Sequence, residues 1–398
     1  MPLLNLRVEQ LDPNSASARS RMVKFPFKLY KGDPYWVPQL TGDRKKYLDP
    51  KHNPSFEYLK VAYFVAEATV IPESSPKGTL TGGMEQDVGI IAAIVNPRHN
   101  EVYHDTVGFF GLFDVINSHE AANALFDAAG AWLGAQGCTV MRGPVTFTIS
   151  DEVGLLVDGF DDAPRIMMTY NPPYYPELLA AYGFKGAMDL YAYKFDLIEQ
   201  FGGTVDGFPP KLNRVVEKLK QRSSLTIRKI DMKHFDDDVE KIKVIYRAAW
   251  EANWGEVPIT DGEIVSIAKQ LKQIIDPNLV FLVEVEGKTV GVGLTVPDAN
   301  FVLKKMGGHI FPFGIVQMLR YQNKIEWVRT LILGVLPEYR HRGVDAVMYY
   351  ETAKEALARG YRYIEGSWIL ANNVDMNLAI QGLGATIYKT YRVYDKEL

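Results

Sequence analysis

The chain places three basic side chains and a glycine at a point where a strand-like run gives way to a helix. Residues 329–335 (RTLILGV) are typical of a strand, and a helix-forming run starts just after Gly343. Arg340, His341 and Arg342 lie between the two. The first N–H groups of a helix have no intrahelical partners, and the helix dipole adds positive charge there. The junction therefore suits an anion such as phosphate. From the charges alone, a solvated basic turn is an equal alternative.

Composition limits the class of protein. The chain has 398 residues, of which 47% are hydrophobic and 23% charged, which is typical of a globular protein with two domains. A net charge of −4 argues against a broad nucleic-acid-binding face, so we expect no nucleic-acid partner. The single cysteine, Cys138, excludes an internal disulfide and a cysteine metal cluster. The histidines show no paired helical spacing, so we expect no metal site.

The apolar segments predict the location of the protein. The N-terminal residues 1–13 lack the apolar core of a signal peptide. No apolar stretch is long enough to cross a bilayer, and candidates such as residues 309–319 are far too short. We therefore expect a cytoplasmic protein, monomeric or homodimeric, without a membrane partner.

The same strand–helix–strand unit occurs twice in the sequence. In each copy an apolar strand with a glycine near its end is followed by a helix closed by glycine and then by another apolar strand. The interval from Gly111 to Gly137 equals that from Gly334 to Gly360. A unit of this length implies a parallel crossover, so we expect a duplicated α/β domain. The first copy also carries a turn-rich insertion at residues 148–164.

Further segments complete the predicted organisation. We expect upstream strands at residues 62–68 and 88–95 in the first copy, and at 280–285 and 289–296 in the second. Residues 298–324 form an amphipathic, aromatic insertion that either builds a helical wall over a pocket or packs in the ordinary way.

The predicted boundaries follow from a break in this pattern. Residues 201–224 contain glycine and proline followed by a basic helix, and are expected to form a linker. The predicted domains are therefore residues 1–200 and 225–398.

The second half resembles the GNAT N-acyltransferases, whose mixed central sheet is flanked by helices and contains a splayed pair of strands. In that family a strand ending in V-x-P precedes Q/R-x-x-G-x-G/A at a helix start, and Val335–Pro337 with Arg340–Val344 fits this pattern. A second block has an asparagine eleven residues before a glycine, as Asn373 and Gly384 do here. The resemblance covers residues 225–398. The first half shares only the order of strands and helices, so the chain resembles a tandem GNAT protein with a degenerate first copy.

The resemblance implies that the second half binds acetyl-CoA or another acyl-CoA. A pyrophosphate needs closely spaced backbone donors, and a glycine allows the backbone to approach it. An unpaired strand end could bind the pantetheine amides and polarise the thioester carbonyl. The residues expected to bind the cofactor are Leu333, Gly334, Val335, Arg340, His341, Arg342, Gly343, Val344, Asp345 and Asn373.

Two positions depart from the family pattern. Asp345 stands where the motif has glycine or alanine, and Ile380 stands where a tyrosine usually acts as general acid. Acyl transfer to an amine still needs a base for the ammonium group. The candidate catalytic residues are Glu365 or Asp298 as base and Tyr388 near the end of the second block.

The first copy is less suited to an anion. Its helix starts near Asp114, Asn117 and Glu120, and the last two have the spacing of a capping box. A helix start capped by its own side chains and flanked by carboxylates is a poor phosphate site. We therefore expect a structural or acceptor-side role for the first domain, and about one CoA per chain.

The implied function is acyl-CoA-dependent N-acyl transfer, with acetyl as the expected acyl group, to an amine of a small molecule or peptide. The alternative is a catalytically silent GNAT-fold protein that binds CoA or another ligand as a scaffold or sensor. A third hypothesis is a relative of the Fem-type transferases, which use an aminoacyl-tRNA donor. The net negative charge disfavours it.

Overall fold

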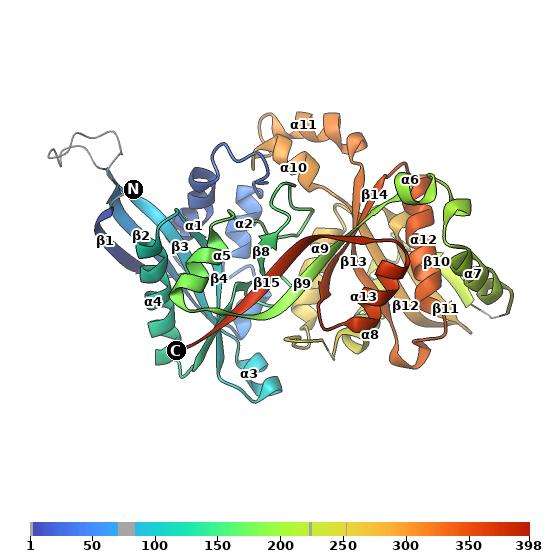
Figure 1. Ribbon diagram of the computed structural model, residues 1–398, viewed down its shortest axis with the longest axis horizontal. Helices are drawn as coiled ribbons and strands as arrows, with labels where there is room; N and C mark the ends of the chain where they lie inside the picture. Colours follow the sequence, from blue (N-terminus) through green and yellow to red (C-terminus); the bar gives the residue numbers. More distant parts are fainter. Residues whose placement is uncertain (1–2, 71–83, 223–224, 252) are drawn as a thin grey trace. The chain divides into compact units, whose positions relative to one another are not determined.

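The computed structural model describes residues 3–70, 84–222, 225–251 and 253–398 (Figure 1). The chain forms two units. Unit 1 comprises Met1–Asp189, Gly307–His309 and Tyr391–Leu398, and unit 2 comprises Leu190–Met306 and Ile310–Thr390. Each unit is a mixed α/β structure. No helix in the described ranges is long and apolar enough to cross a membrane.

Unit 1 is built on a mixed sheet with the strand order β1-β2-β3-β4-β5-β15. Only the β4–β5 pair is parallel, as expected for a crossover through a helix. The predicted strands at 62–68 and 88–95 are confirmed as parts of β2 and β3. The strands and helices are β1 (Leu3–Leu11), β2 (Lys60–Val70), β3 (Met84–Val95), β4 (Val107–Val115), β5 (Val140–Gly143), β15 (Thr386–Glu397), α1 (Ala16–Leu29), α2 (Thr41–Tyr47), α3 (Pro97–Tyr103), α4 (His119–Ala135) and α5 (Tyr175–Tyr182). Shorter elements are η1 (Pro54–Glu57), β6 (Val145–Thr146), β7 (Glu152–Val153) and β8 (Leu155–Asp158).

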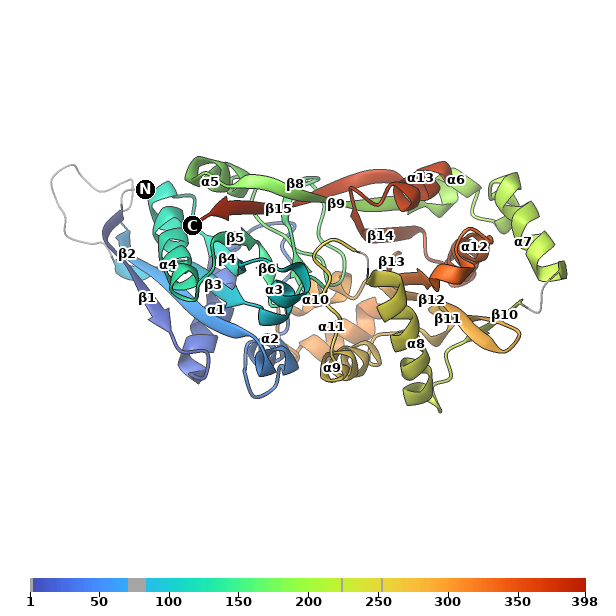
Figure 2. The same cartoon turned by 90° about the horizontal axis from the view of Figure 1, so that it is seen from below.

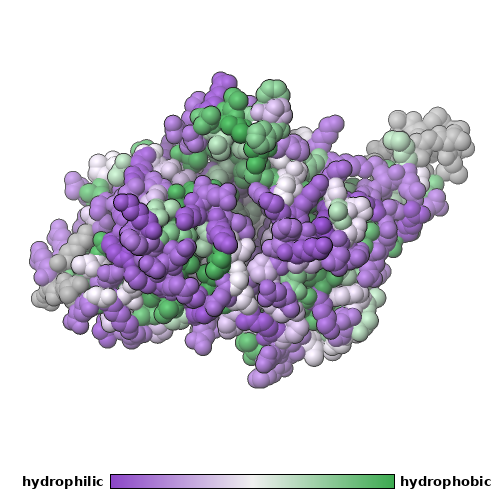
Figure 3. Space-filling view, turned by 180° about the vertical axis from the view of Figure 1, so that it is seen from behind, coloured by the Kyte–Doolittle hydropathy of each residue, from purple (hydrophilic) through white to green (hydrophobic). Residues whose placement is uncertain are grey.

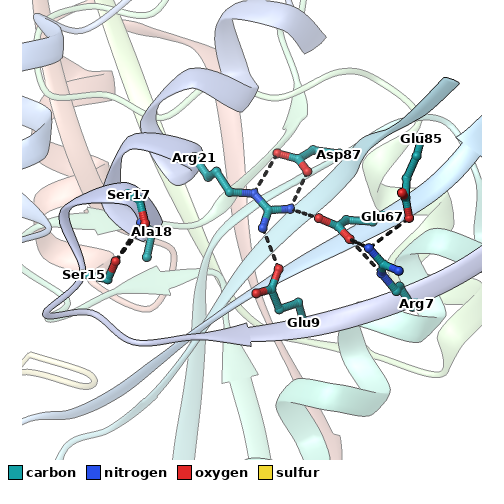
Figure 4. A network of polar contacts seen from close by, with 9 residues as sticks. All are labelled: Arg7, Glu9, Ser15, Ser17, Ala18, Arg21, Glu67, Glu85 and Asp87. Carbon is teal, nitrogen blue, oxygen red and sulfur yellow. Dashed lines mark hydrogen bonds and ion pairs between the residues drawn. The ribbon is translucent and has the colours of Figure 1, made fainter.

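Helices α4 and α1 cover opposite faces of this sheet (Figure 2). The apolar side of α4 is fully buried against β2 and β3, which is why its sequence is rich in alanine, leucine and phenylalanine. Helix α1 is tied to the other side by Arg21, whose guanidinium group contacts Asp87, Glu67 and Glu9 from three neighbouring strands (Figure 4). The same three carboxylates raise the pKa of Arg21 further.

In unit 2 the strands follow the order β9-β14-β13-β12-β11-β10, also with mixed orientation. Again one pair, β13–β14, is parallel. The predicted strands at 280–285 and 289–296 are confirmed as β11 and β12. The strands are β9 (Lys185–Asp196), β10 (Leu225–Lys229), β11 (Val280–Val285), β12 (Lys288–Pro297), β13 (Trp327–Val335) and β14 (Tyr363–Leu370). The helices are α6 (Leu197–Phe201), α7 (Pro210–Arg222), α8 (Phe235–Trp250), α9 (Asp261–Leu271), α10 (Asn300–Met306), α11 (Gly314–Tyr321), α12 (Val344–Ala358) and α13 (Val374–Gly382). Short 3₁₀ turns are η2 (Val205–Gly207), η3 (Pro277–Leu279), η4 (Gln322–Lys324) and η5 (Pro337–Tyr339).

Glycines let the helices of unit 2 approach both faces of the sheet. A Cβ on Gly334 would lie 2.6 Å from Trp250 of α8, so this glycine permits the close packing of α8 on β13. A Cβ on Gly291 would lie 3.1 Å from the sulfur of Met348 in α12. Helices α12 and α8 therefore cover opposite faces (Figure 2).

Each sheet is completed by a strand from the other half of the sequence. The end of β15 pairs with β5 in unit 1, with Tyr394 opposite Gly143. The end of β9 pairs with β14 in unit 2, with Phe195 opposite Ile364. The units therefore differ from the predicted ranges 1–200 and 225–398, because strand pairing follows the sheet edge and not the position in the sequence.

Candidate active site

Strands β13 and β14 separate within the sheet of unit 2. Their parallel pairing covers Trp327–Thr330 and Tyr363–Gly366, and it extends no further along the described strands. Strand β13 continues to Val335 and remains paired with β12, with a register shift between Thr330 and Ile332. One edge of residues 331–335 therefore lacks a neighbouring strand, as the resemblance implied.

The antiparallel ladder indicates which backbone groups face this open edge. Leu336 N donates to Val290 O at 2.9 Å, which marks a hydrogen-bonded pair. Because such pairs alternate along an antiparallel ladder, the backbone groups of Gly334 point to β12, and those of Leu333 and Val335 point to the open edge. Gly334 therefore serves the packing of α8, while its two neighbours can offer backbone N–H and C=O groups to a ligand.

The start of α12 has no cap. Gly343 is the N-cap residue, in the left-handed region with φ 83°, and no side chain caps the helix. His341 also has a left-handed φ, of 58°. From residue 341 to residue 346, no backbone N–H donates to any residue that the structure describes. This row of donors at the positive end of a helix is suited to an anion.

Two local features of the structure favour a glycine at position 343. Its left-handed φ is unfavourable for a residue with a Cβ. A Cβ there would also lie 2.8 Å from Leu219 Cδ1 and 3.2 Å from Val215 Cγ1, both on α7. The sequence predicts that Gly343 admits a phosphate, and its left-handed φ together with the close approach of α7 favours a glycine there independently of any ligand.

The predicted basic residues differ in their surroundings. Arg340 donates from Nη2 to Ala249 O at 3.2 Å, which ties the loop to α8. The guanidinium group of Arg342 lies 5.4 Å from the centre of the Tyr339 ring. His341 and Arg342 are exposed, Asp345 and Gly343 are half-buried, and Val344 is buried. The basic side chains of His341 and Arg342 therefore remain at the surface beside the row of backbone donors.

A buried polar cluster lies where β13 and β14 part. Glu365 is fully buried and is opposite Arg329 in the last part of the parallel pairing. Its carboxylate accepts hydrogen bonds from Ser367 Oγ at 2.6 Å and from Tyr388 OH. Arg329 Nε lies 3.5 Å from Glu365 Oε1 and donates to Ser367 Oγ at 2.9 Å. The structure thus brings two predicted catalytic residues, Glu365 and Tyr388, into direct contact.

Asp298 lies near the same cluster. It is 2% exposed, and its carboxylate accepts a hydrogen bond from Asn300 N at 3.2 Å. Its own N–H donates to Trp327 O at 2.9 Å, and the Trp327 ring lies 5.8 Å from the Tyr388 ring. The sequence interpretation missed Arg329 and the fully buried Lys389. For Arg329, a charged residue within an otherwise apolar strand was the available signal, whereas the polar strand around Lys389 carries no such signal.

In the second block of the motif, Asn373 caps a helix and Ile380 lies in the core. Asn373 is the N-cap of α13 and accepts a hydrogen bond from Met376 N at 3.3 Å. Its side chain is exposed, and its predicted contact with a cofactor stays a prediction. Ile380 is 3% exposed and packs with Tyr193 and Ile369, so it belongs to the core.

The corresponding region of unit 1 is filled by its own chain. Parallel pairing between β4 and β5 ends at Phe109 and Arg142 in the described ladder. Beyond it, a Cβ on Gly111 would lie 2.7 Å from Val145 O, and Leu112 N donates to Thr146 Oγ1 at 3.3 Å. Strand β6 therefore occupies the space that remains open beside β13 in unit 2.

The helix start of unit 1 is capped, although not as predicted. The N-cap of α4 is Ser118, whose Oγ accepts from Ala121 N at 3.2 Å. The expected capping box of Asn117 and Glu120 is therefore wrong by one residue, because the backbone is still extended at Ser118 (φ −152°, ψ 117°). The expectation that this helix carries a side-chain cap is confirmed.

Asp114, at the end of β4, is enclosed in unit 1. Its carboxylate accepts hydrogen bonds from Tyr30 OH at 2.6 Å and Tyr175 OH at 3.2 Å. Burial raises its pKa to about 7, in spite of these hydrogen bonds and the nearby Arg44. Within the described ranges, no group of three or more His, Cys, Asp and Glu side chains could hold a metal ion.

Comparisons with known proteins agree with this architecture. The chain is 33% identical over 388 residues to a bacterial ceramide synthase from Caulobacter vibrioides, covering 95% of this chain and 94% of the relative. It is 30% identical over 383 residues to protein YghO of Escherichia coli, covering 94% and 92%. No protein-family model matches the sequence.

A solved structure agrees in fold. A tandem GNAT protein from the clavulanic acid biosynthesis pathway superimposes with a TM-score of 0.55 at 12% identity, over 99% of this chain and 98% of the other. The full-length fold and the full-length similarity in sequence lead to one conclusion. The chain has the fold of a tandem GNAT protein, and it belongs to the family of the bacterial ceramide synthase and YghO.

Proposed function

We propose that the protein is an acyl-CoA-dependent N-acyltransferase whose acyl donor binds in unit 2. The observation that carries the proposal is the open edge of β13, which leads directly into the uncapped start of α12. The unpaired backbone groups lie in two stretches, on the edge of β13 and at the start of α12, and they match a ligand with amides at one end and a pyrophosphate at the other. The identity to a ceramide synthase over the full length supports the same class of reaction.

The chain offers a distinct group to each part of such a donor. Backbone groups of Leu333 and Val335 would pair with the pantetheine amides and donate to the thioester oxygen. The N–H groups of residues 341–346, with the side chains of His341 and Arg342, would bind the pyrophosphate. Asp345 is the one carboxylate in that row, and it weakens phosphate binding if it faces the site.

The reaction requires one proton to leave the acceptor. The amine nitrogen forms a bond to the thioester carbonyl carbon, the carbon–sulfur bond breaks, and CoA departs as thiolate. N–H groups on the edge of β13 stabilise the oxyanion that develops. The proposed base for the amine proton is Glu365 or Asp298, with Tyr388 hydrogen-bonded to Glu365.

The proposed acceptor is the primary amine of a long-chain amino alcohol, and the proposed acyl group is a fatty acyl chain. A ceramide is an N-acylated base of this kind, so the name of the 33% identical relative supports both. Acetyl, the acyl group expected from the sequence, remains one candidate donor.

The second candidate function is a catalytically silent CoA-binding protein. It is favoured by Ile380, a core residue at the position where the family usually has a tyrosine. Thiol release from acetyl-CoA and palmitoyl-CoA, measured with sphinganine and with a short primary amine, separates the two functions. We expect thiol release with palmitoyl-CoA and sphinganine, together with the N-acylated product in the mass spectrum. CoA binding without thiol release for any pair would favour the silent protein.

A further inference from the structure

Helix α11 presents its apolar side to solvent. Phe313, Val316 and Leu319 are three residues apart and form one stripe, with exposed fractions of 75%, 59% and 61%. Within α11 only Gly314 is buried. Phe311, immediately before the helix, is 76% exposed. The space-filling view shows the hydrophobic side chains gathered over the part formed by α10 and α11 (Figure 3).

Three cations surround the ring of Tyr321, at the C-terminal end of α11. Lys305 of α10, Arg320 of α11 and Lys324 of η4 lie 5.7, 5.6 and 5.4 Å from the centre of the Tyr321 ring. None of the three forms an ion pair with a residue in the described ranges. Residues 299–325 contain no aspartate or glutamate, although the whole chain has a net charge of −4. The segment is therefore a local basic patch on an acidic protein.

We propose that residues 300–324 dock the protein onto the surface of a bilayer that contains anionic phospholipids. Phe311 and the α11 stripe enter the boundary between headgroups and acyl chains, and the three cations contact lipid phosphates. Tyr321, which has an apolar ring and a polar hydroxyl, is suited to the same boundary. Two copies of the chain meeting through this face would bring like charges together, which disfavours a symmetric dimer as the occupant.

This inference deepens the proposed function, and only its link to a lipid substrate rests on that function. Long-chain amines and fatty acyl groups partition into bilayers, so an enzyme held at the bilayer surface meets them at high local concentration. The sequence-based expectation of no membrane partner considered spanning segments alone. Docking through one amphipathic face needs no such segment.

The test measures binding to vesicles without any acyl-CoA, so its outcome is independent of catalysis. Purified protein is sedimented with vesicles of phosphatidylcholine alone and of phosphatidylcholine with phosphatidylglycerol at a ratio of about 3:1. We expect the parent protein to prefer the anionic vesicles and to lose that preference in high salt. The double variant Phe311→Ser/Phe313→Ser should show a partition coefficient about tenfold lower.

Two further variants complete the design. Lys305→Gln/Arg320→Gln/Lys324→Gln removes only charge and should abolish the preference for anionic vesicles. The matched control Val374→Ser/Leu378→Ser replaces side chains that are 60% and 63% exposed on α13, and should bind as the parent does. Circular dichroism and light scattering are recorded for every variant.

Three outcomes would overturn the proposal. The first is a parent that does not bind anionic vesicles, and the second is a charge variant that binds them as tightly as the parent. The third is a parent dimer that the phenylalanine variant converts to a monomer, which would identify a second copy as the occupant. If the phenylalanine variant misfolds, the charge variant still decides, because its three side chains are exposed and lack ion pairs with described residues.

Discussion

At the scale of single residues, Glu365 is buried but well supplied with partners. Ser367 and Tyr388 donate to it, and Arg329 lies beside it on the neighbouring strand. A buried ion pair contributes little net stability, but removing one partner leaves an uncompensated charge. Glu365 therefore has a structural role whether or not it also acts as a base.

A structural role and a catalytic role of Glu365 would affect different measured quantities. Glu365→Gln should lower the free energy of unfolding by about 3 kcal/mol, because the buried guanidinium group of Arg329 loses the carboxylate that lies beside it. If Glu365 is also the base, the single-turnover rate of acyl transfer should fall by about 100-fold or more, with unchanged affinity for acyl-CoA. Asp298→Asn serves as the matched comparison. Parental rates in both variants would exclude both residues as the base.

The raised pKa of Asp114 should make the free energy of unfolding depend on pH. Its pKa is about 7 in the folded protein and about 4 in an unfolded chain. Between these values the folded state binds more protons, so the contribution of Asp114 to stability is greatest below pH 4 and is lost as the pH rises through about 7. In Asp114→Asn the decrease in unfolding free energy between pH 4.5 and 8 should be smaller than in the parent. Urea unfolding at each pH measures it.

A suitable control for this experiment is Asp127→Asn. Asp127 also accepts a hydrogen bond from a tyrosine, Tyr182, at 2.6 Å, but on the surface. The control removes a carboxylate–tyrosine hydrogen bond at an exposed position, so it separates the effect of burial from that of the hydrogen bond. An Asp114→Asn variant with the same pH profile as the parent would show that the carboxyl group is not protonated on folding.

At the scale of elements, the start of α12 shows how one glycine can satisfy two demands. The position of Gly343 in the motif suggests contact with phosphate. The structure shows that Gly343 also has a left-handed backbone conformation and packs closely against α7. A bulky residue at 343 would strain the backbone and displace Leu219. Loss of CoA binding in such a variant would report on the packing of two helices as much as on a ligand. Exposed residues of the same loop, His341 and Arg342, are therefore better probes of the site.

At the scale of the whole molecule, the two halves of the chain share a plan but not a binding site. Both contain a parallel pair that separates, yet β6 fills the opening in unit 1 and a side chain caps α4. In unit 2 the opening adjoins an uncapped helix. Each sheet also takes its last strand from the other half, so cutting the chain within residues 201–224 would separate strands from the sheets that they complete.

This asymmetry predicts the stoichiometry of the cofactor. Isothermal titration of the intact chain with CoA should give about one site, because among the residues that the structure describes only those of unit 2 combine an open strand edge with free helix donors. Replacing Arg342 by glutamine should weaken that site and leave its stoichiometry unchanged. Two sites of similar affinity would mean that β6 moves aside in unit 1, and would contradict the view that the first copy is degenerate.

The sequence by itself determined the features that depend on local order. Periodicity gave β2, β3, β11 and β12, and the equal glycine intervals revealed the repeated α/β unit. The junction at 340–343 predicted a helix start with free donors, because a strand, a turn and a helix N-terminus are encoded by adjacent residues. Sequence and motif spacing also identified Glu365 and Tyr388 as candidates, without showing that they touch.

Tertiary structure decided what depends on neighbours that are distant in the sequence. Only strand register brought Glu365, Arg329 and Tyr388 together from three strands. Only the path of β6 closed the opening in unit 1, and only the fold left the stripe on α11 exposed. An apolar stripe looks the same in sequence whether a core covers it or not. The physical reason is that burial is a property of what packs against a residue, and the local chain does not encode that partner.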